Sequence, residues 1–372
     1  MNTLVYHSKD LYADSEKLKN AAEILKNGGL VVIPTETVYG IAARADKAGI
    51  EALNELKQRD LSKFYSLHIP NTESLKKYVQ STDMRTAKLV RNFWPGPVTV
   101  VFSLTDQQVD STVKALGKQW EPMYKENSIG VRCPDNEITS KLLELAQVPI
   151  LATSANLSGM PAAVDFDQAF QTFNEKVPLI INDGACEESM GSTVVRIKNG
   201  NIDILREGAI NSEEIADIST VNIVFVCSTN TCCSPIAAEI CRKLLSKRIG
   251  CDVERLRLFG YNISSAGVMA PIKQPLRTEA LNLGKNLGFD LSDHISTPLA
   301  PRDILCCDLI LTMDADQKKR IVDFYPQLED RCKLLAGDYD ICDPADGSSE
   351  VYSKFADVVE NAINERIGEL LI

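Results

Sequence analysis

The chain has 372 residues, 44% of them hydrophobic, a length that one hydrophobic core rarely supports and that predicts two domains. It carries 40 Lys and Arg against 51 Asp and Glu, a formal net charge of −11, which excludes a dedicated nucleic-acid binder and leaves room only for a weak, local RNA-binding groove. We find no run of about 18 apolar residues and no basic leader followed by an apolar stretch, so we expect a cytoplasmic protein without a membrane span.

The eleven cysteines are expected to be reduced thiols. They are scattered along the chain, include the adjacent pairs Cys232-Cys233 and Cys306-Cys307, and form no Cys-x-x-Cys pair. That pattern is not a disulfide framework in a chain this long. With only three histidines, the sequence gives little support to a structural zinc site, and we expect no metal ligands.

Helices and strands are predicted to alternate through the first 210 residues. Leu18 and Leu25 fall at helical spacing within a helix expected over 14–26, and Pro95 prevents a helix before it from continuing. Further helices are expected at 49–56, 73–79, 84–93, 139–146 and 165–174, with strands at 30–33, 67–69, 98–104, 128–132, 149–153, 179–181, 192–197 and 202–206. The polar residues 106–127 are expected to form an irregular surface excursion.

A second alternation begins after a polar stretch at 211–220, which is predicted to be a short helical linker. Strands are expected at 221–226, 261–265, 309–313 and 331–335, and helices at 235–247, 277–287, 301–306 and 351–371. Alternating elements predict a parallel sheet, so both halves are assigned to the α/β class. We place the two domains at 1–211 and 221–372.

The first candidate site follows the strand at 30–33. The segment Pro-Thr-Glu-Thr-Val-Tyr-Gly at 34–40 has two hydroxyl groups flanking a carboxylate, and Lys57, Arg59, Lys63 and His68 come soon after. Open α/β sheets bind ligands at the carboxyl ends of their strands, where hydroxyls and cations suit an anion. Taken alone, however, these residues favour a buried turn with a cluster of surface cations.

Eight ordered motifs over residues 20–210 change that balance, because together they resemble the threonylcarbamoyl-adenylate synthase family, which has the YrdC-type fold. The motifs are Pro-Thr-Glu-Thr-Val-Tyr-Gly at 34–40, Lys-x-Arg at 57–59, His68, Phe-Trp-Pro-Gly-Pro-Val-Thr at 93–99, Gly-Val-Arg-Cys-Pro at 130–134, Ser-Ala-Asn-Leu-Ser-Gly at 154–159, Ser-Thr-Val at 192–194 and Arg-Glu-Gly at 206–208. The resemblance implies a twisted, open mixed sheet covered by helices.

The resemblance also implies an activity. L-Threonine, bicarbonate or carbon dioxide, and ATP would give threonylcarbamoyl-AMP and pyrophosphate, and the product would feed other tRNA-modification proteins that act on an adenosine beside the anticodon. Cations must hold the triphosphate, an arginine the threonine carboxylate, and hydroxyls the reacting groups. Mg²⁺ is implied as an ion bridged by phosphate oxygens rather than enclosed by protein ligands.

The family pattern assigns roles to individual residues. L-Threonine would be bound by Thr35, His68, Arg132 and Asp183. ATP would be bound by Lys57, Arg59, Lys63, Ser128, Ser154, Ser192 and Arg206. Without the family pattern, Arg132 reads equally as a surface charge at a strand end, His68 as a core histidine, and Ser154 and Ser192 as caps of a helix or turn.

One departure from the family falls directly after the Lys-x-Arg motif. The family usually continues with Pro-Ser-x-Asn-Pro, whereas this chain has Asp-Leu-Ser-Lys-Phe at 60–64. Leu61 and Lys63 therefore replace the serine and asparagine that help to hold the nucleotide. Lys63 can still meet a phosphate as a point charge, so we expect ATP binding with weakened or altered activity.

The second half resembles low-molecular-weight protein-tyrosine phosphatases and the related arginine phosphatases, over residues 221–372. The resemblance rests on Cys-Ser-Thr-Asn-Thr-Cys-Cys-Ser-Pro at 227–235 and on later segments at 265–267, 293–294, 308–313 and 343–344. It implies a small Rossmann-like domain whose loop curls around an oxyanion at a helix N-terminus. Cys227 would be the nucleophilic thiolate, Ser234 would steady it, and Asp343 would protonate the leaving group.

That second site lacks its arginine. The family requires Cys-x5-Arg, and the sixth residue after Cys227 is Cys233. Loss of one preorganised donor typically costs about 10²–10³ in rate, so we expect a weak or inactive phosphatase that still binds oxyanions. Thiol redox chemistry among Cys227, Cys232 and Cys233 and a degenerate docking module remain open. For the whole chain, the alternative function is a nucleotide- or RNA-binding or regulatory protein with both catalytic sites degenerate.

Overall fold

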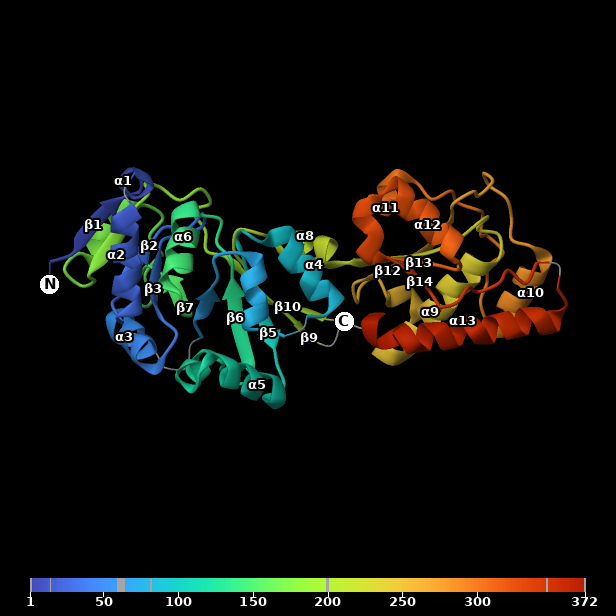
Figure 1. Cartoon of the computed structure of the whole chain (residues 1–372), viewed down its shortest axis with the longest axis horizontal. Helices are drawn as coiled ribbons and strands as arrows, with labels where there is room; N and C mark the ends of the chain where they lie inside the picture. The colour runs from blue at the N-terminus through green and yellow to red at the C-terminus, as the bar shows by residue number, and fades with distance from the viewer. Residues whose placement is uncertain are drawn as a thin grey trace. The chain divides into compact units, whose positions relative to one another are not determined.

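The computed structural model describes residues 2–13, 15–58, 64–80, 82–198, 201–345 and 347–370. By their contacts, the residues form two compact units, which we describe one at a time (Figure 1). The first unit comprises Met1–Thr82, Leu89–Lys198 and Ile202–Ile218, and the second comprises Asp83–Lys88, Asn199–Asn201 and Ser219–Ile372.

A mixed, ten-stranded sheet organises the described part of the first unit. In spatial order its strands are β1 (Leu4–His7), β8 (Leu179–Asn182), β2 (Val31–Ile33), β3 (Gly40–Arg44), β7 (Ile150–Ser154), β4 (Ser66–His68), β6 (Ser128–Arg132), β5 (Val98–Ser103), β9 (Thr193–Lys198) and β10 (Asn201–Arg206). β3 runs antiparallel to both β2 and β7, whereas β4 pairs parallel to β6. The sheet is therefore of the mixed type that we expected.

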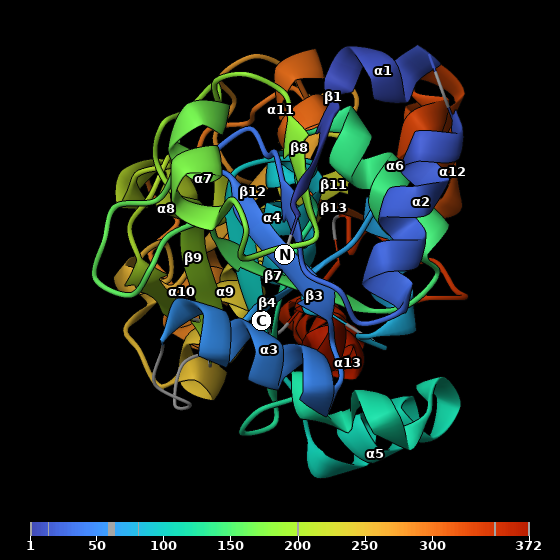
Figure 2. The ribbon, with the colours of Figure 1, turned by 90° about the vertical axis from the view of Figure 1, so that its left-hand side faces the viewer.

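Helices and short 3₁₀ turns connect these strands. They are α1 (Ser8–Ala13), α2 (Ser15–Lys26), α3 (Lys47–Lys57), η1 (Thr72–Lys77), α4 (Met84–Phe93), α5 (Asp106–Leu116), η2 (Lys118–Met123), α6 (Glu137–Ala146), α7 (Phe166–Phe173) and α8 (Ser212–Ser219). Leu18 and Leu25 of α2 pack with Leu142 of α6 over Val31 and Leu179 of the sheet. Figure 2 shows α1, α2 and α6 gathered on one side of these strands.

The start of α3 is fixed by backbone geometry. Asp46 caps the helix by accepting a 3.0 Å hydrogen bond from the backbone N–H of Gly49, as acidic N-caps do. A Cβ at Gly49 would lie 2.1 Å from the carbonyl oxygen of Arg44, so only glycine fits where the strand turns into the helix. α3 then runs to Lys57, the first residue of the Lys-x-Arg motif.

Some sequence-based predictions for the first unit were wrong or incomplete. Residues 106–127 are not irregular, because they contain α5 and η2. Thr105 and Gln108 form a reciprocal capping box at the start of α5. Val109, Val113 and Leu116 lie at helical spacing on one face of the helix and are half-buried, although only Thr112 is fully buried. The sequence analysis also assigned no structure to β1 or β3.

The described part of the second unit is built on a four-stranded parallel sheet, as predicted. In spatial order the strands are β12 (Tyr261–Gly267), β11 (Val221–Cys227), β13 (Leu309–Thr312) and β14 (Cys332–Leu334). The helices are α9 (Cys233–Ile249), α10 (Thr278–Leu287), α11 (Pro301–Cys306), α12 (Ala315–Phe324) and α13 (Ser349–Leu370), with 3₁₀ turns η3 (Val253–Arg255) and η4 (Pro326–Arg331). Of these helices, α12 was not predicted.

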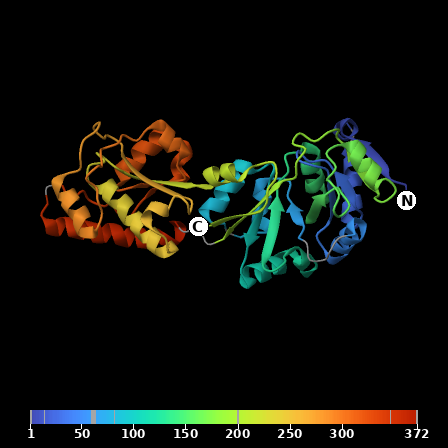
Figure 3. The ribbon, with the colours of Figure 1, turned by 180° about the vertical axis from the view of Figure 1, so that it is seen from behind.

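Both faces of this small sheet are buried. Alternate residues of a strand point to opposite faces, and accordingly Phe225 of β11 packs in a core with α9, α10 and α13, whereas Val226 packs in a second core with α11 and α12. In Figure 3 the long red helix α13 runs beside the yellow helix α9. Helices on both faces of a parallel sheet give the Rossmann-like arrangement that we expected.

All eleven cysteines have free thiols. Among the described residues, no helix combines the length and the apolar character that crossing a membrane requires.

Candidate functional site

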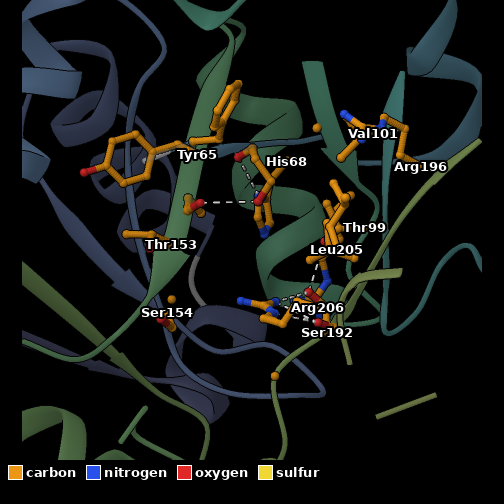
Figure 4. A pocket seen from close by; sticks show the side chains of 18 of the residues that line it. Tyr65, His68, Thr99, Val101, Thr153, Ser154, Ser192, Arg196, Leu205 and Arg206 are labelled. Carbon is orange, nitrogen blue, oxygen red and sulfur yellow. Dashed lines mark hydrogen bonds between the residues drawn. The ribbon is translucent and has the colours of Figure 1, made fainter. Parts of the chain in front are cut away.

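A cavity of about 830 Å³ opens in the first unit. Residues of strands β3, β4, β5, β6, β7, β9 and β10 line it. Its lining comes from segments as far apart in sequence as Thr35 and Glu207. The structure brings seven of the predicted ligand-binding side chains to this cavity: Thr35, His68, Ser128, Arg132, Ser154, Ser192 and Arg206. Figure 4 shows several of them facing the same space.

The loop between β2 and β3 forms a rigid wall of the cavity. The buried hydroxyl of Thr35 donates to the carbonyl of Val38 over 2.6 Å and lies 3.0 Å from the Thr37 hydroxyl. The carbonyl of Pro34 accepts a 2.6 Å hydrogen bond from Thr139 at the start of α6. These bonds fix the two threonines on either side of Glu36, as an anion- or amine-binding turn requires.

Arg132 and Glu36 form a buried ion pair in this wall. Nη2 of Arg132 lies 2.9 Å from Oε1 of Glu36 and donates to the Thr37 hydroxyl over 2.6 Å. Among the described side chains, Nε of Arg132 and Oε2 of Glu36 are buried without a hydrogen-bond partner. Buried polar atoms are normally paired. Arg132 also lines the cavity, so its guanidinium is the part of the pair that can meet an anionic group of a ligand.

His68 is held as a neutral ring. Burial and, next, the positive charge of Arg132 lower the pKa of His68 from 6.5 to about 3. Nδ1–H donates to the carbonyl of Ser66 over 3.1 Å, which leaves Nε2 as an acceptor. The ring therefore serves as an uncharged hydrogen-bond acceptor at the cavity wall.

A second polar cluster lies where β5, β9 and β10 meet the cavity. Nη2 of Arg206 donates to the hydroxyl of Ser192 over 2.9 Å and to its carbonyl over 2.7 Å, and the Ser192 hydroxyl lies 3.0 Å from that of Thr99 (Figure 4). A Cβ at Gly208 would lie 2.1 Å from the carbonyl oxygen of Gly191, so glycine is required for this close approach of two backbone segments. The guanidinium and hydroxyls suit phosphate or ribose oxygens.

Two predicted ligands do not line the cavity. Lys57 is buried, and its Nζ donates to the carbonyl of Ser154 and, over 2.9 Å, to Oδ1 of Asn156. Asp183 accepts a 2.9 Å hydrogen bond from Asn136. Lys57 thus supports the Ser154 loop from behind. Arg59, Leu61 and Lys63 lie outside the described residues.

Sequence reasoning assigned no role to two residues of the cavity region. Glu36 and Thr99 stand inside motifs that were recognised, at 34–40 and 93–99. A carboxylate between two hydroxyls was noted, but only the structure shows that it pairs with Arg132.

In the second unit, Cys227 ends β11 and the loop to α9 closes around its sulfur. The Ser234 hydroxyl lies 3.0 Å from Sγ, and the backbone N–H of Asn230 donates to Sγ over 3.2 Å. Asn230 adopts a left-handed conformation with φ of 58°, which lets its N–H turn inward. The structure thus brings Cys227 and Ser234 together.

The burial of Cys227 works against the thiolate that we expected. Burial raises the pKa of the Cys227 thiol above its ordinary value, although the hydrogen bonds from Ser234 and Asn230 act in the opposite direction. Desolvation outweighs the helix N-terminus because the sulfur is almost fully buried. The third predicted residue, Asp343, is exposed and forms a two-bond ion pair with Arg277, at 3.0 Å and 3.3 Å.

Comparison with known proteins agrees with this architecture. Residues 23–208, half of the chain, match the family model Sua5/YciO/YrdC, described as "Telomere recombination". Residues 222–370 match the model of the low molecular weight phosphotyrosine protein phosphatases. The chain therefore belongs to the Sua5/YciO/YrdC family and carries a phosphatase-type second part.

The individual relatives are named as enzymes. Threonylcarbamoyl-AMP synthase of Pyrococcus abyssi is 33% identical over 203 residues, which are 54% of this chain and 57% of the relative. A putative threonylcarbamoyl-AMP synthase of Methanocaldococcus jannaschii is 30% identical over 208 residues, 55% of this chain and 93% of the relative. These names place the family among nucleotidyl-transferring enzymes of tRNA modification.

A solved structure shows the same fold. The crystal structure of P. abyssi Sua5 complexed with L-threonine superposes with a TM-score of 0.51 at 24% identity, over 67% of this chain and 78% of that one.

Proposed function

We propose that the first unit makes threonylcarbamoyl-AMP and pyrophosphate from L-threonine, bicarbonate or carbon dioxide, and ATP. The names of the relatives support this reaction, and so does the threonine bound to P. abyssi Sua5. The observation that carries the proposal is the guanidinium of Arg132, which Glu36 holds in a buried ion pair and which lines one cavity with the Ser192–Arg206 cluster.

The amino-acid end of the cavity would recognise threonine as a zwitterion. Arg132 would bind its carboxylate, while Glu36 would hold the guanidinium of Arg132 in place. Thr35 and the neutral His68 supply further hydrogen bonds, and with a pKa of about 3 His68 is too weak a base to hold a proton near neutral pH, so it acts by orientation. Asp183 is bonded to Asn136 and does not line the cavity, so it would contact threonine only if the segment that carries it moved.

The nucleotide end would bind ATP through Ser128, Ser154, Ser192 and Arg206. Lys57 would keep the Ser154 loop in place, and Arg59 and Lys63 would add charge against the phosphates. Hydroxyl and carboxylate oxygens line the cavity, which fits Mg²⁺, a cation that prefers oxygen ligands. Bound with ATP, Mg²⁺ would neutralise charge on the triphosphate.

In the reaction, the threonine nitrogen would bond to the carbon of carbon dioxide and lose a proton, which gives a carbamate. A carbamate oxygen would then attack the α-phosphorus, and the bond from that phosphorus to the bridging oxygen of pyrophosphate would break. Both steps require that the three reactants are held in the correct relative positions, which fixed hydrogen-bond donors and hydroxyl groups can do. We assign this chemistry to a domain at 1–211, and its product would pass to tRNA-modification proteins.

Pyrophosphate release with and without threonine tests the proposal. We expect release that requires threonine, and at least about a tenfold loss of kcat/KM in Arg132→Lys, because lysine lacks the planar fork. Lys141→Gln, at an exposed residue of α6, is the control. Release that is absent or independent of threonine contradicts the proposal.

A second candidate is a nucleotide- or RNA-binding or regulatory protein with both sites degenerate. Leu61, Lys63 and Cys233 favour it, since each departs from its family pattern. Saturable ATP binding by calorimetry, without pyrophosphate release under any condition, would favour this candidate over the first.

For the second domain, at 221–372, we propose an oxyanion-binding site with weak or no phosphatase activity. The raised pKa of the buried Cys227 thiol and the missing arginine support this assignment. Hydrolysis of an aryl phosphate by the wild type that disappears in Cys227→Ser would contradict the inactive assignment.

A further inference from the structure

Three ligand-type atoms converge at the start of α9, outside the cavity of the first unit. Cys232 is the N-cap residue of α9 and Cys233 is its first residue. Their two sulfurs and a carboxylate oxygen of Asp343 all lie within 4.8 Å of one another. We propose that Cys232, Cys233 and Asp343 form a binding site for a thiophilic divalent cation of the zinc class.

The spacing of the three atoms suits such a cation. Zinc binds thiolate sulfur at about 2.3 Å and carboxylate oxygen at about 2.0–2.2 Å in tetrahedral sites, so two sulfurs on one ion lie about 3.8 Å apart. Separations of up to 4.8 Å therefore need to shrink by about 1 Å at most. Asp343 is exposed, so it can move and gives the ion a route to the buried thiols. A water molecule would complete the tetrahedron.

The position of the thiols suits an anionic ligand set around a cation. The N-terminus of a 17-residue helix stabilises the negative charge that two metal-bound thiolates carry. Binding would release one proton from each thiol. Two thiolates and one carboxylate then exceed the charge of the ion by one, and Arg277, 3.0 Å from Asp343, supplies the balancing positive charge.

The site depends on the residue that distinguishes this chain from the phosphatases. An arginine at position 233 would repel a cation, whereas a thiol at that position offers a ligand. The sequence alone did not predict the site, because Asp343 lies 110 residues beyond Cys233 and no Cys-x-x-Cys or histidine motif accompanies the pair.

Titration of the reduced full-length chain with Cd²⁺ tests the proposal, because cadmium bound to thiolate gives a sulfur-to-metal charge-transfer absorption. We expect one tight Cd²⁺ per chain, displaced by Zn²⁺. Cys233→Ser should lose about half of the absorption and at least about tenfold in affinity, since even supporting residues of metal sites contribute 10–100-fold. Asp343→Asn should lose affinity and keep the absorption. Cys306→Ser, at an exposed cysteine, is the matched control.

Three results would overturn the proposal. The first is the absence of charge-transfer absorption in the reduced wild type, and the second is equal titration curves for Cys233→Ser and Cys306→Ser. The third is absorption that is lost in Cys342→Ser but kept in Cys233→Ser, which would assign the metal to the exposed thiol beside Asp343. Far-UV circular dichroism establishes that each variant is folded. Asp343→Asn changes an exposed residue, so its loss of affinity also tests the site without disturbing the core.

Discussion

Nη2 of Arg132 donates to Oε1 of Glu36 across 2.9 Å, and both side chains are buried although 96 residues separate them in sequence. Removing one partner of a buried pair leaves an uncompensated charge, which typically costs about 3–5 kcal/mol. The pair is therefore a structural element of the first unit as well as a candidate part of its ligand site.

Glu36→Gln is expected to lower the free energy of unfolding of the first unit by about 3 kcal/mol. Urea unfolding followed by tryptophan fluorescence measures it, because both tryptophans, Trp94 and Trp120, lie in the first unit. Adding Arg132→Gln to this variant should recover part of the lost stability, since it removes the buried charge that Glu36→Gln leaves uncompensated. Equal stability of Glu36→Gln and the wild type would show that the pair contributes little.

His68 predicts a dependence of stability on pH. Its pKa is lowered to about 3 in the folded state from 6.5, so between these values the unfolded chain binds more protons and stability falls as the pH falls. The stabilising contribution is complete above pH 6.5 and is lost towards pH 3, with a slope of up to about 1.4 kcal/mol per pH unit. In His68→Asn this slope should disappear from urea midpoints measured between pH 7 and pH 4.5. His7→Asn, at an exposed residue, is the control, and an unchanged slope in His68→Asn would refute the assignment.

Arg206→Lys is expected to raise the KM for ATP by about 10-fold with a smaller change in kcat. Its guanidinium holds Ser192 by two hydrogen bonds from one nitrogen, and a lysine can neither reproduce this arrangement nor grip a phosphate as a planar fork, a loss worth about 1.5 kcal/mol or more. Steady-state pyrophosphate release at varied ATP measures the change. Arg91→Lys, at an exposed position on α4, is the matched control, and a KM that rises equally in both variants would argue against a specific role for Arg206.

Cys233→Arg is expected to raise hydrolysis of an aryl phosphate by at least about 10², because it supplies a charged donor at the position where the related phosphatases hold one. The gain should vanish when Cys227→Ser is added. Cys233→Lys should give a smaller gain, since its single ammonium cannot hold two phosphoryl oxygens. If arginine and lysine give the same rate as the wild type, the missing guanidinium is not what limits the site.

The main elements of the fold could be predicted because apolar runs and helical stripes are local signals. The strands at 98–104 and 221–226 and the helix at 84–93 agree closely with β5, β11 and α4. The misses have physical causes. β3 has a buried small-residue sequence, Gly-Ile-Ala-Ala-Arg, that lacks alternation. In α5 the apolar residues Val109, Val113 and Leu116 stand among many polar residues and are only half-buried, so the stripe is a weak signal.

The candidate site, like the fold, could be predicted only in part from the sequence. The motifs located Arg132, His68 and Ser192 at strand ends, and the structure brings them to one cavity. Motifs cannot tell a residue that touches a ligand from one that supports it, however. Lys57 donates to the backbone of Ser154 and does not line the cavity. The raised pKa of Cys227 follows from its burial, which depends on packing that no short sequence pattern encodes.

The strand order of the first unit also constrains how the protein folds during its synthesis. β1 pairs with β8 and β5 with β9, so strands made early wait for partners made much later. At about 5–20 residues per second, roughly 10–40 s pass on the ribosome before β9 and β10 emerge. During that interval the nascent chain exposes open strand edges that can pair with other chains, so this topology concentrates the risk of aggregation in the time before residue 206 has been made.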